Sequence, residues 1–225
     1  MQFFYLANVR LPTEKAHGLQ IIQMCSAFAE AGVKVILVAP RRLQTHNLAK
    51  QELFQFYNLP QNFQVKYLPC IDLIKLKIPH LLFWLQSFTF TITAFFYLLF
   101  HAKKNDIIYT RHLLIAWPLL LFTRSKIFYE AHDFPNQGQK IFSWLIKHAQ
   151  SVITISQGLT KVFQQIIPTE KILTAPDSVD LKRFTINLTT RQAREKLNLP
   201  LEKKLLIYTG HFYKWKGVDI LVPTF

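Results

Sequence analysis

The chain has 225 residues, of which 50% are hydrophobic and 18% are charged, a composition that supports a large core and argues against a disordered chain. Its 27 lysine and arginine residues outnumber the 13 acidic residues, and the net charge of +14 favours anionic partners such as phosphates, nucleotides or an acidic membrane surface. The basic residues are spread along the chain and form no arginine-rich arm, so we expect no nucleic-acid partner.

Two features of the sequence bear on localisation. Cys25 and Cys70 stand alone without metal-ligand spacing, which is typical of a reducing compartment. The first residues carry no basic stretch ahead of their apolar run, so we expect no signal peptide. Together these features predict a cytoplasmic protein.

Strand patterns and amphipathic helix patterns alternate along the chain. Residues 3–9 form a short apolar run typical of a buried strand, and residues 11–18 are expected to form a loop. A helix pattern follows and ends at Gly32, which suits a left-handed position after a helix, and a second buried strand is predicted at 33–38. Such a unit has parallel strands joined by a right-handed crossover.

The alternation continues through most of the remaining chain. Further strands are predicted at 64–68, 106–110, 126–130, 152–156 and 172–175, and helices are predicted at 137–149 and 157–167. This order predicts an α/β fold, a Rossmann-like open parallel sheet flanked by helices. In such sheets ligands bind outside the carboxyl ends of the strands.

Several familiar sites are missing from the sequence. The 6 glycines are not arranged as a dinucleotide fingerprint, and neither a Walker loop nor a His-Glu-x-x-His helix is present. Ser156 lacks the Gly-x-Ser-x-Gly elbow of hydrolases and is interpreted as the N-cap of the helix at 157–167. Asp133 is likewise interpreted as an N-cap.

The segment 208–217 reads Tyr-Thr-Gly-His-Phe-Tyr-Lys-Trp-Lys-Gly, which predicts the end of a strand, a loop and the start of a helix. The amides at a helix N-terminus bind anions, and such a loop belongs at the beginning of an α/β domain. We therefore expect a complete domain at 1–185 and a linker at 186–203. Residues 204–225 would be the first strand and loop of a truncated second domain.

In combination, these segments resemble the N-terminal half of a family 4-type glycosyltransferase with the GT-B fold. The resemblance is carried by Leu11-Pro-Thr-Glu-Lys-Ala-His-Gly18, residues 33–38, Asp106-Ile-Ile-Tyr-Thr-Arg111, Tyr129-Glu-Ala-His-Asp133, Val152-Ile-Thr-Ile-Ser156, Asp177-Ser-Val-Asp180 and residues 208–217. It implies two Rossmann-like domains, of which the first binds the acceptor and the second binds the nucleotide-sugar. It also implies transfer to a glycan or lipid-linked acceptor with retention, needing neither a metal nor a cofactor.

The resemblance implies roles for individual residues of the first domain. His132 would be catalytic, and Lys15, His17, Gly18 and Arg111 would contact the acceptor. Each has a purely structural alternative: a histidine at a helix entry, ordinary loop residues, a glycine that lets the loop turn, and a surface charge after a strand.

The resemblance also assigns donor phosphate binding to Gly210, His211, Lys216 and Gly217. A lysine ammonium and backbone amides would stabilise charge on the leaving phosphate, whereas His211 replaces the family's arginine and is a weaker phosphate ligand. The family's Glu-x7-Glu pair would follow this loop, so we expect the 225-residue chain alone to be an inactive fragment. The alternative is a non-catalytic basic α/β module that binds sugar, phosphate or an anionic membrane surface.

Residues 78–100 contain no aspartate, glutamate, lysine or arginine, and their length is close to the roughly 20 residues that span a bilayer. A span would place the first two strands and the next two on opposite sides of a membrane. We therefore expect no transmembrane helix. Two alternatives stay open: a helix buried against the sheet, or one lying at an anionic membrane surface, where Lys75, Lys77, Lys103 and Lys104 would meet lipid phosphates.

Overall fold

The computed structural model describes residues 1–42, 52–73, 79–123, 125–135, 139–210 and 212–224. The chain forms two compact units, Met1–Asp177 and Ser178–Phe225. The sequence placed this boundary later, at residue 185.

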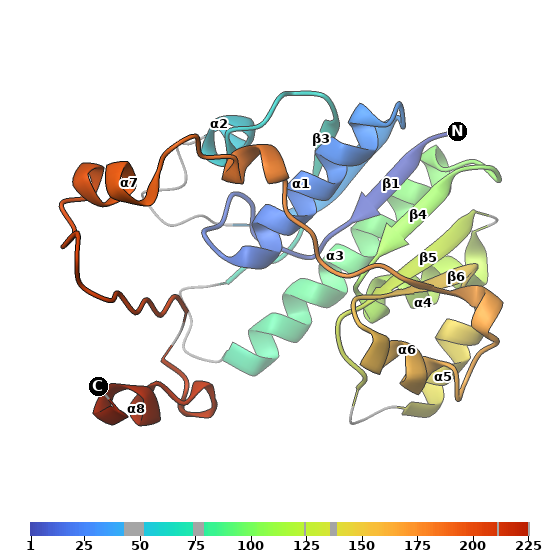
Figure 1. Ribbon diagram of the computed structural model, residues 1–225. Coiled ribbons are helices and arrows are strands. Elements are labelled where there is room, and N and C mark those ends of the chain that lie inside the picture. The colour runs from blue at the N-terminus through green and yellow to red at the C-terminus, as the bar shows by residue number, and fades with distance from the viewer. Residues whose placement is uncertain (43–51, 74–78, 124, 136–138, 211, 225) are drawn as a thin grey trace. The chain divides into compact units, whose positions relative to one another are not determined.

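The first unit is built on one sheet of seven strands, all parallel, in the order β3-β2-β1-β4-β5-β6-β7 (Figure 1). The strands are β1 (Phe3–Leu6), β2 (Val35–Arg41), β3 (Gln64–Pro69), β4 (Ile107–Thr110), β5 (Lys126–Ala131), β6 (Ser151–Thr154) and β7 (Ile172–Thr174). β1 pairs with β2, and the order reverses between β1 and β4, as in doubly wound folds. The expected Rossmann-like fold is confirmed.

Helices cover both faces of this sheet. α1 (Ala16–Glu30) and α2 (Leu53–Tyr57) pack with Tyr5 and Leu37 on one face. α3 (Pro79–His101) and α4 (Leu113–Phe122) pack with Ile127 on the other face. α5 (Gln139–His148) and α6 (Gln157–Phe163) pack with Tyr129, which points to the same face as Ile127 because side chains alternate along a strand.

The local signals in the sequence act as expected at two helix ends. Gly32 follows α1 with φ of 84°, a left-handed conformation that glycine adopts without strain. The Ser156 side chain accepts a hydrogen bond from the amide of Leu159, which confirms it as the N-cap of α6. The prediction that Asp133 is an N-cap is wrong, because the next helix, α5, begins only at Gln139.

The sequence did not predict α4, because this helix is apolar on all sides and carries Pro118 in its interior. A helix without a polar face gives no amphipathic period. Cys25, on α1, is buried, and both it and Cys70 are free thiols.

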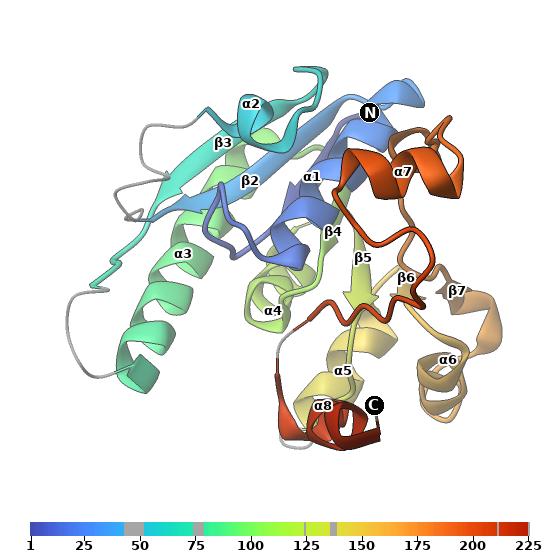
Figure 2. The ribbon, with the colours of Figure 1, turned by 60° about the vertical axis from the view of Figure 1, so that its left-hand side comes forward.

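α3 begins beyond the carboxyl ends of the strands and runs back along the sheet (Figures 1 and 2). Its segment Leu81–His101 is long and apolar enough to cross a membrane by length and composition. However, Phe90, Ala94 and Leu98 are fully buried against the sheet, and the strands on either side of α3 belong to that one sheet. α3 is therefore a layer helix of this fold, with a second side that is exposed.

The second unit contains α7 (Thr190–Lys196), α8 (Val218–Leu221) and short 3-10 turns. The expected linker at 186–203 thus holds a helix, which begins with a capping box between Thr189 and Gln192. The prediction that residues 204–225 begin with a strand is wrong, since the described residues of this segment form no strand. A strand needs a neighbouring strand with which to form hydrogen bonds, and the described residues of this unit contain none.

Candidate functional site

Polar side chains gather at the carboxyl edge of the sheet. Arg111 and His112 follow β4, and His132 and Asp133 follow β5. β4 and β5 are paired in parallel, so the two pairs of residues emerge at the same edge. This is the position at which open parallel sheets bind ligands.

Glu130, at the end of β5, is the centre of a buried hydrogen-bond network. Its side chain is only 2% exposed and accepts hydrogen bonds from the Tyr5 hydroxyl at 3.0 Å, His132 Nε2 at 2.7 Å and Arg111 Nη2 at 3.3 Å. Arg111 also donates to the Tyr5 hydroxyl oxygen at 3.0 Å and to Gln20 Oε1 at 3.2 Å. Residues from β1, α1, β5 and the segment after β4 thus meet at one carboxylate.

The charges in this network stabilise one another. Burial by itself raises the pKa of Glu130, but the hydrogen bond from His132 and the charge of Arg111 outweigh burial and lower that pKa. Burial also opposes the charge of Arg111, whereas Tyr5 and Glu130 raise its pKa. Burial and the Glu130 charge hold the pKa of Tyr5 well above its ordinary value, so the phenol keeps its proton. The network is therefore an ion pair supported by a neutral phenol.

The ionised Glu130 fixes the tautomer of His132. A carboxylate only accepts hydrogen bonds, so His132 Nε2 must carry the hydrogen that it shares with Glu130. With the hydrogen on Nε2, a neutral form of this ring would offer Nδ1 as an acceptor. With 29% of its side chain exposed, His132 is accessible to a ligand at the sheet edge.

A pocket of about 220 Å³ opens beside this network. Its lining combines polar groups with aromatic walls from α3 and α5: Asn8, Phe83, Ser87, Thr91, Arg111, His112, Ile115, Tyr129, Asp133, Pro135 and Phe142. Arg111 Nε and His112 Nε2 are buried and have no hydrogen-bond partner among the described residues. Buried polar atoms of this kind are available to a bound ligand.

His112 is held in its neutral form. Burial, followed by the charges of Arg111, His17 and His132, lowers its pKa to about 4. The same interactions indicate that the three histidines share one electrostatic environment around Arg111.

Three of the expected site residues lie at the start of α1. α1 begins at Ala16, so His17 and Gly18 lie in its first turn and not in the loop where the sequence placed them, and Lys15 is the N-cap. Burial and then the charge of Lys15 lower the pKa of His17. The Lys15 side chain is exposed, and it therefore lies in solvent beside the cluster.

Gly18 is explained by a close approach. A Cβ atom added at Gly18 would lie 2.3 Å from Thr13 Cγ2 and 2.7 Å from the Tyr57 hydroxyl. That hydroxyl accepts a hydrogen bond from the Thr13 amide and donates one to the Thr13 carbonyl. Gly18 thus lets the loop close onto α1, where Tyr57 fixes it.

Three side chains near the network could offer ligand atoms to a metal ion. Glu130, His132 and Asp177 place one such atom each within 4.8 Å of one another. Glu130 already binds Arg111 and His132, and Gln20 donates a hydrogen bond to Asp177. The Arg111 guanidinium beside this group disfavours a cation, so the arrangement fits a hydrogen-bond network better than a metal site.

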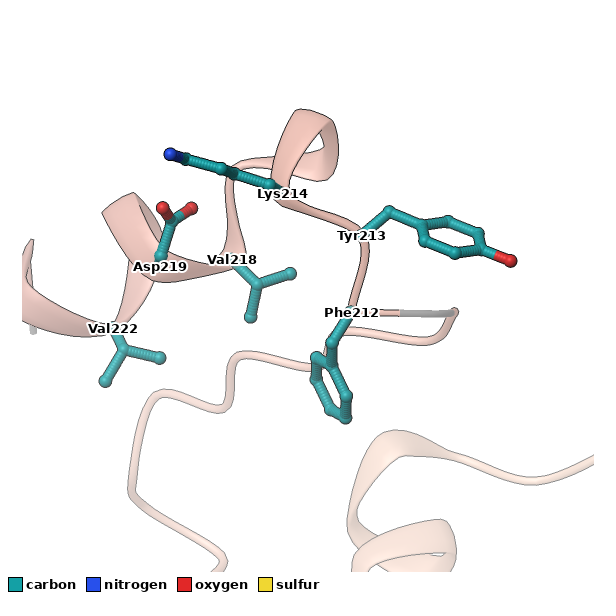
Figure 3. Close-up of a pocket in the computed structure, with 6 residues that line it drawn as sticks. All are labelled: Phe212, Tyr213, Lys214, Val218, Asp219 and Val222. Atoms are coloured by element: carbon teal, nitrogen blue, oxygen red, sulfur yellow. The ribbon is translucent and has the colours of Figure 1, made fainter.

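The expected donor loop lies in the second unit. Lys216 ends a 3-10 turn and stacks its ammonium over the Trp215 ring at 4.1 Å, and Gly210 and Gly217 have positive φ angles of 147° and 69°. His211 lies outside the described residues. Beside this loop, Phe212, Val218 and Val222 point to one side of a hollow of about 390 Å³, whose lining also includes Tyr213, Lys214 and Asp219 (Figure 3). Gly210, Lys216 and Gly217, which were expected to bind the donor phosphates, do not line this hollow.

Sequence interpretation missed Glu130, Tyr5 and Gln20 as members of the network. Glu130 carried a usable signal, since it is an acidic residue inside an otherwise buried strand. Gln20 looks like any polar residue of an amphipathic helix. Tyr5 looks like any aromatic core residue.

Neither a protein-family model nor a curated protein sequence matches the chain. Solved structures match its fold. An E. coli structure described as trehalose-6-phosphate bound with UDP-2-fluoro glucose aligns with a TM-score of 0.55 and 11% identity, covering 88% of this chain and 54% of that one. The catalytic domain of starch synthase IV from Arabidopsis thaliana, bound to ADP and acarbose, aligns with a TM-score of 0.52 and 14% identity, covering 90% and 60%.

A third match is a Listeria monocytogenes protein assigned as a UDP-N-acetylglucosamine 2-epimerase, with a TM-score of 0.54, 7% identity and coverage of 88% and 51%. At these identities the comparisons show a shared fold. The chain spans about half the length of the structures that it matches. Because one fold supports several chemistries, the reaction must be argued from the site.

Proposed function

We propose that this chain is the acceptor-binding part of a glycosyltransferase that transfers a sugar from a nucleotide-sugar to a glycan or lipid-linked acceptor. The observation that carries the proposal is the hydrogen bond of 2.7 Å between His132 Nε2 and buried Glu130 at the carboxyl edge of the sheet. It fixes the orientation of the imidazole next to Asp133, which lines the pocket together with Arg111 and His112. The fold is shared with a structure that is bound to UDP-2-fluoro glucose, and this supports the reaction class.

In this proposal His132 acts on the sugar hydroxyls. A neutral imidazole whose Nε2 is bound to a carboxylate presents Nδ1 as a hydrogen-bond acceptor or base for a hydroxyl group. Glu130 holds the ring and stabilises any positive charge that develops on it. Arg111 neutralises Glu130 and has one buried nitrogen, Nε, for an acceptor oxygen.

The remaining candidates are assigned by position. Lys15 and His17 would contact the acceptor from the start of α1, and Gly18 would let that loop pack closely. Gly210, His211, Lys216 and Gly217 would bind the donor phosphates once a complete second domain surrounds them. Retention and independence from metal rest on the family resemblance alone.

We further propose that these 225 residues by themselves do not transfer sugar. Catalysis of this kind depends on positioning the donor across a closed cleft, and Lys216 alone does not form a donor pocket. The purified chain, incubated with labelled nucleotide-sugars and membrane extract, should give neither transfer nor donor hydrolysis. Turnover above that of a Lys216→Ala control would contradict this proposal.

The test of the function itself uses the same chain extended by a nucleotide-sugar-binding domain that carries Glu-x7-Glu. This longer protein should transfer sugar from at least one donor in a panel of nucleotide-sugars. If it binds glycans or anionic vesicles but transfers nothing from any donor, the non-catalytic basic module is the better description.

A further inference from the structure

The face of the sheet to which Ile127 points, covered by α3 to α6, has few acidic residues. α3, α4, α5 and α6, which cover this face, contain no aspartate or glutamate. From residue 73 to 169 the acidic residues are Asp106, Glu130 and Asp133. Asp106 and Glu130 are buried and hydrogen-bonded, which leaves Asp133, at the carboxyl edge, as the exposed acid of this stretch. The charged side chains of these helices are therefore the lysines of α5 and α6, because α3 and α4 also contain no lysine or arginine.

Two neighbouring helices on this face also expose aromatic side chains. The aromatic face consists of six residues that are each more than half exposed: Trp84, Phe88, Phe96 and Phe100 on α3, and Trp117 and Phe122 on α4. Phe95 connects the two helices, because its ring lies 5.4 Å from that of Phe96 and 5.7 Å from that of Phe122. The exposed rings of Phe96 on α3 and Phe122 on α4 are thus joined through Phe95.

The aromatic face is not needed to hold α3 in the fold. The helix already buries Phe90, Ala94 and Leu98 against the sheet, and the stripe through Trp84, Phe88 and Phe96 points the other way. A helix that is apolar on both sides belongs between two apolar layers. Contiguous exposed apolar surface of this kind marks an interaction site.

A basic hollow lies at the end of the sheet where the strands begin. Lys104, Lys126 and His148 line it, next to Leu120 of α4, and its volume is about 390 Å³. None of the described lining residues is acidic. Lys103, next to Lys104, is exposed as well. The hollow can therefore accept phosphate groups.

We propose that the aromatic face docks on an anionic lipid bilayer, with the basic hollow against the lipid phosphates. Aromatic side chains beside lysines match a bilayer interface, where rings enter the acyl boundary and ammonium groups remain at the headgroups. A second copy of the chain is a poorer occupant, because it would bring another net charge of +14 and another basic hollow to the same contact. The proposal stands apart from the glycosyltransferase proposal, since it rests on a different surface and requires no turnover.

The test is co-sedimentation of the 225-residue protein with vesicles of phosphatidylcholine alone or mixed equally with phosphatidylglycerol. Binding should require the anionic lipid. Lys103→Glu with Lys104→Glu should weaken it by roughly tenfold or more. The matched control, Lys203→Glu with Lys204→Glu, makes the same charge change on another exposed lysine pair and should bind like the wild type.

A second pair of variants tests the aromatic face. Phe88→Ser with Trp117→Ser should weaken binding by at least about tenfold, because both rings lose their burial in lipid. Leu173→Ser with Trp215→Ser replaces exposed apolar residues elsewhere and should leave binding unchanged. Quenching of tryptophan fluorescence by brominated lipid should occur in the wild type and disappear in Trp84→Phe with Trp117→Phe. This variant keeps an aromatic ring at both positions and therefore perturbs the fold less than the serine variant.

Three outcomes would overturn the proposal. The first is equal binding to both kinds of vesicle or to neither. The second is an equal loss of binding in each variant and its matched control. The third is a concentration-dependent dimer in sedimentation velocity that Phe88→Ser with Trp117→Ser abolishes while vesicle binding stays at the wild-type level, because the aromatic face would then be covered by a second copy.

Discussion

His132 Nε2 lies 2.7 Å from Oε1 of Glu130, and the two residues are only two positions apart in the sequence. Glu130 lies in the last two residues of β5 and His132 follows the strand directly, so the pair is a local feature of the chain. What the fold adds is Arg111, from the segment after the neighbouring strand β4, which pairs with Glu130 and, after the hydrogen bond from His132, also lowers its pKa.

Replacing Glu130 by glutamine should remove the buried charge without changing the shape of the side chain. The Arg111 guanidinium would then be left without its counter-ion, and the free energy of unfolding should fall by about 3 kcal/mol. The measurement is urea unfolding at neutral pH. Glu170→Gln, the same change at an exposed site, should be within error of the wild type, and an equal effect of the two substitutions would remove Glu130 from the centre of the network.

His132→Ala should affect turnover far more than stability. The ring is partly exposed and, among the described residues, hydrogen-bonds to Glu130, whereas an acid-base group contributes roughly a hundredfold or more to the rate. In the extended, active protein the rate should fall by that amount while the melting temperature stays nearly constant. His148→Ala, which changes an exposed histidine of α5, is the control. An unchanged rate with a lower melting temperature would make His132 structural.

His112 should make stability depend on pH between its unfolded and folded pKa values. Its folded pKa is lowered to about 4 from the ordinary value of 6.5, so below pH 6.5 the unfolded chain binds a proton that the folded protein refuses. The contribution of His112 to the free energy of unfolding is therefore fully present above about pH 6.5 and is lost as the pH falls. The loss should be about 2 kcal/mol between about pH 7 and about pH 5. His112→Phe should lack this part of the loss. Parallel pH profiles for the two proteins would show that His112 is protonated as easily in the folded state as in the unfolded one.

Gly18→Ala should destabilise the protein although alanine favours helices. The new Cβ would meet Thr13 and the Tyr57 hydroxyl, and overpacking of this kind costs about 1–3 kcal/mol. Gly158→Ala is the matched control in α6, where the nearest atom, Ser156 Oγ, lies 3.9 Å away. That substitution should stabilise by about 0.5–1 kcal/mol. Thermal unfolding of both variants checks the prediction, and two shifts of the same sign would contradict it.

The order of elements in the first unit could be predicted from the sequence because each signal is local. Apolar runs mark strands that helices cover on both faces, and Gly32 and Ser156 punctuate helices through their own backbone and side-chain chemistry. The same locality explains the failures. α4 has no polar face to give a period, and residues 205–209 look like a strand but have no neighbouring strand to pair with.

For the candidate site, the sequence by itself determined which residues follow the strands and therefore reach the carboxyl edge, including Arg111 and His132. Only the tertiary structure decided what these residues do to one another. Tyr5, Gln20 and Glu130 are far apart in the sequence, and their polarity is unremarkable until parallel pairing places β1, β4 and β5 side by side. Hydrogen bonds and charge interactions act over a few ångströms, so a pattern of residue types along the chain carries no record of them.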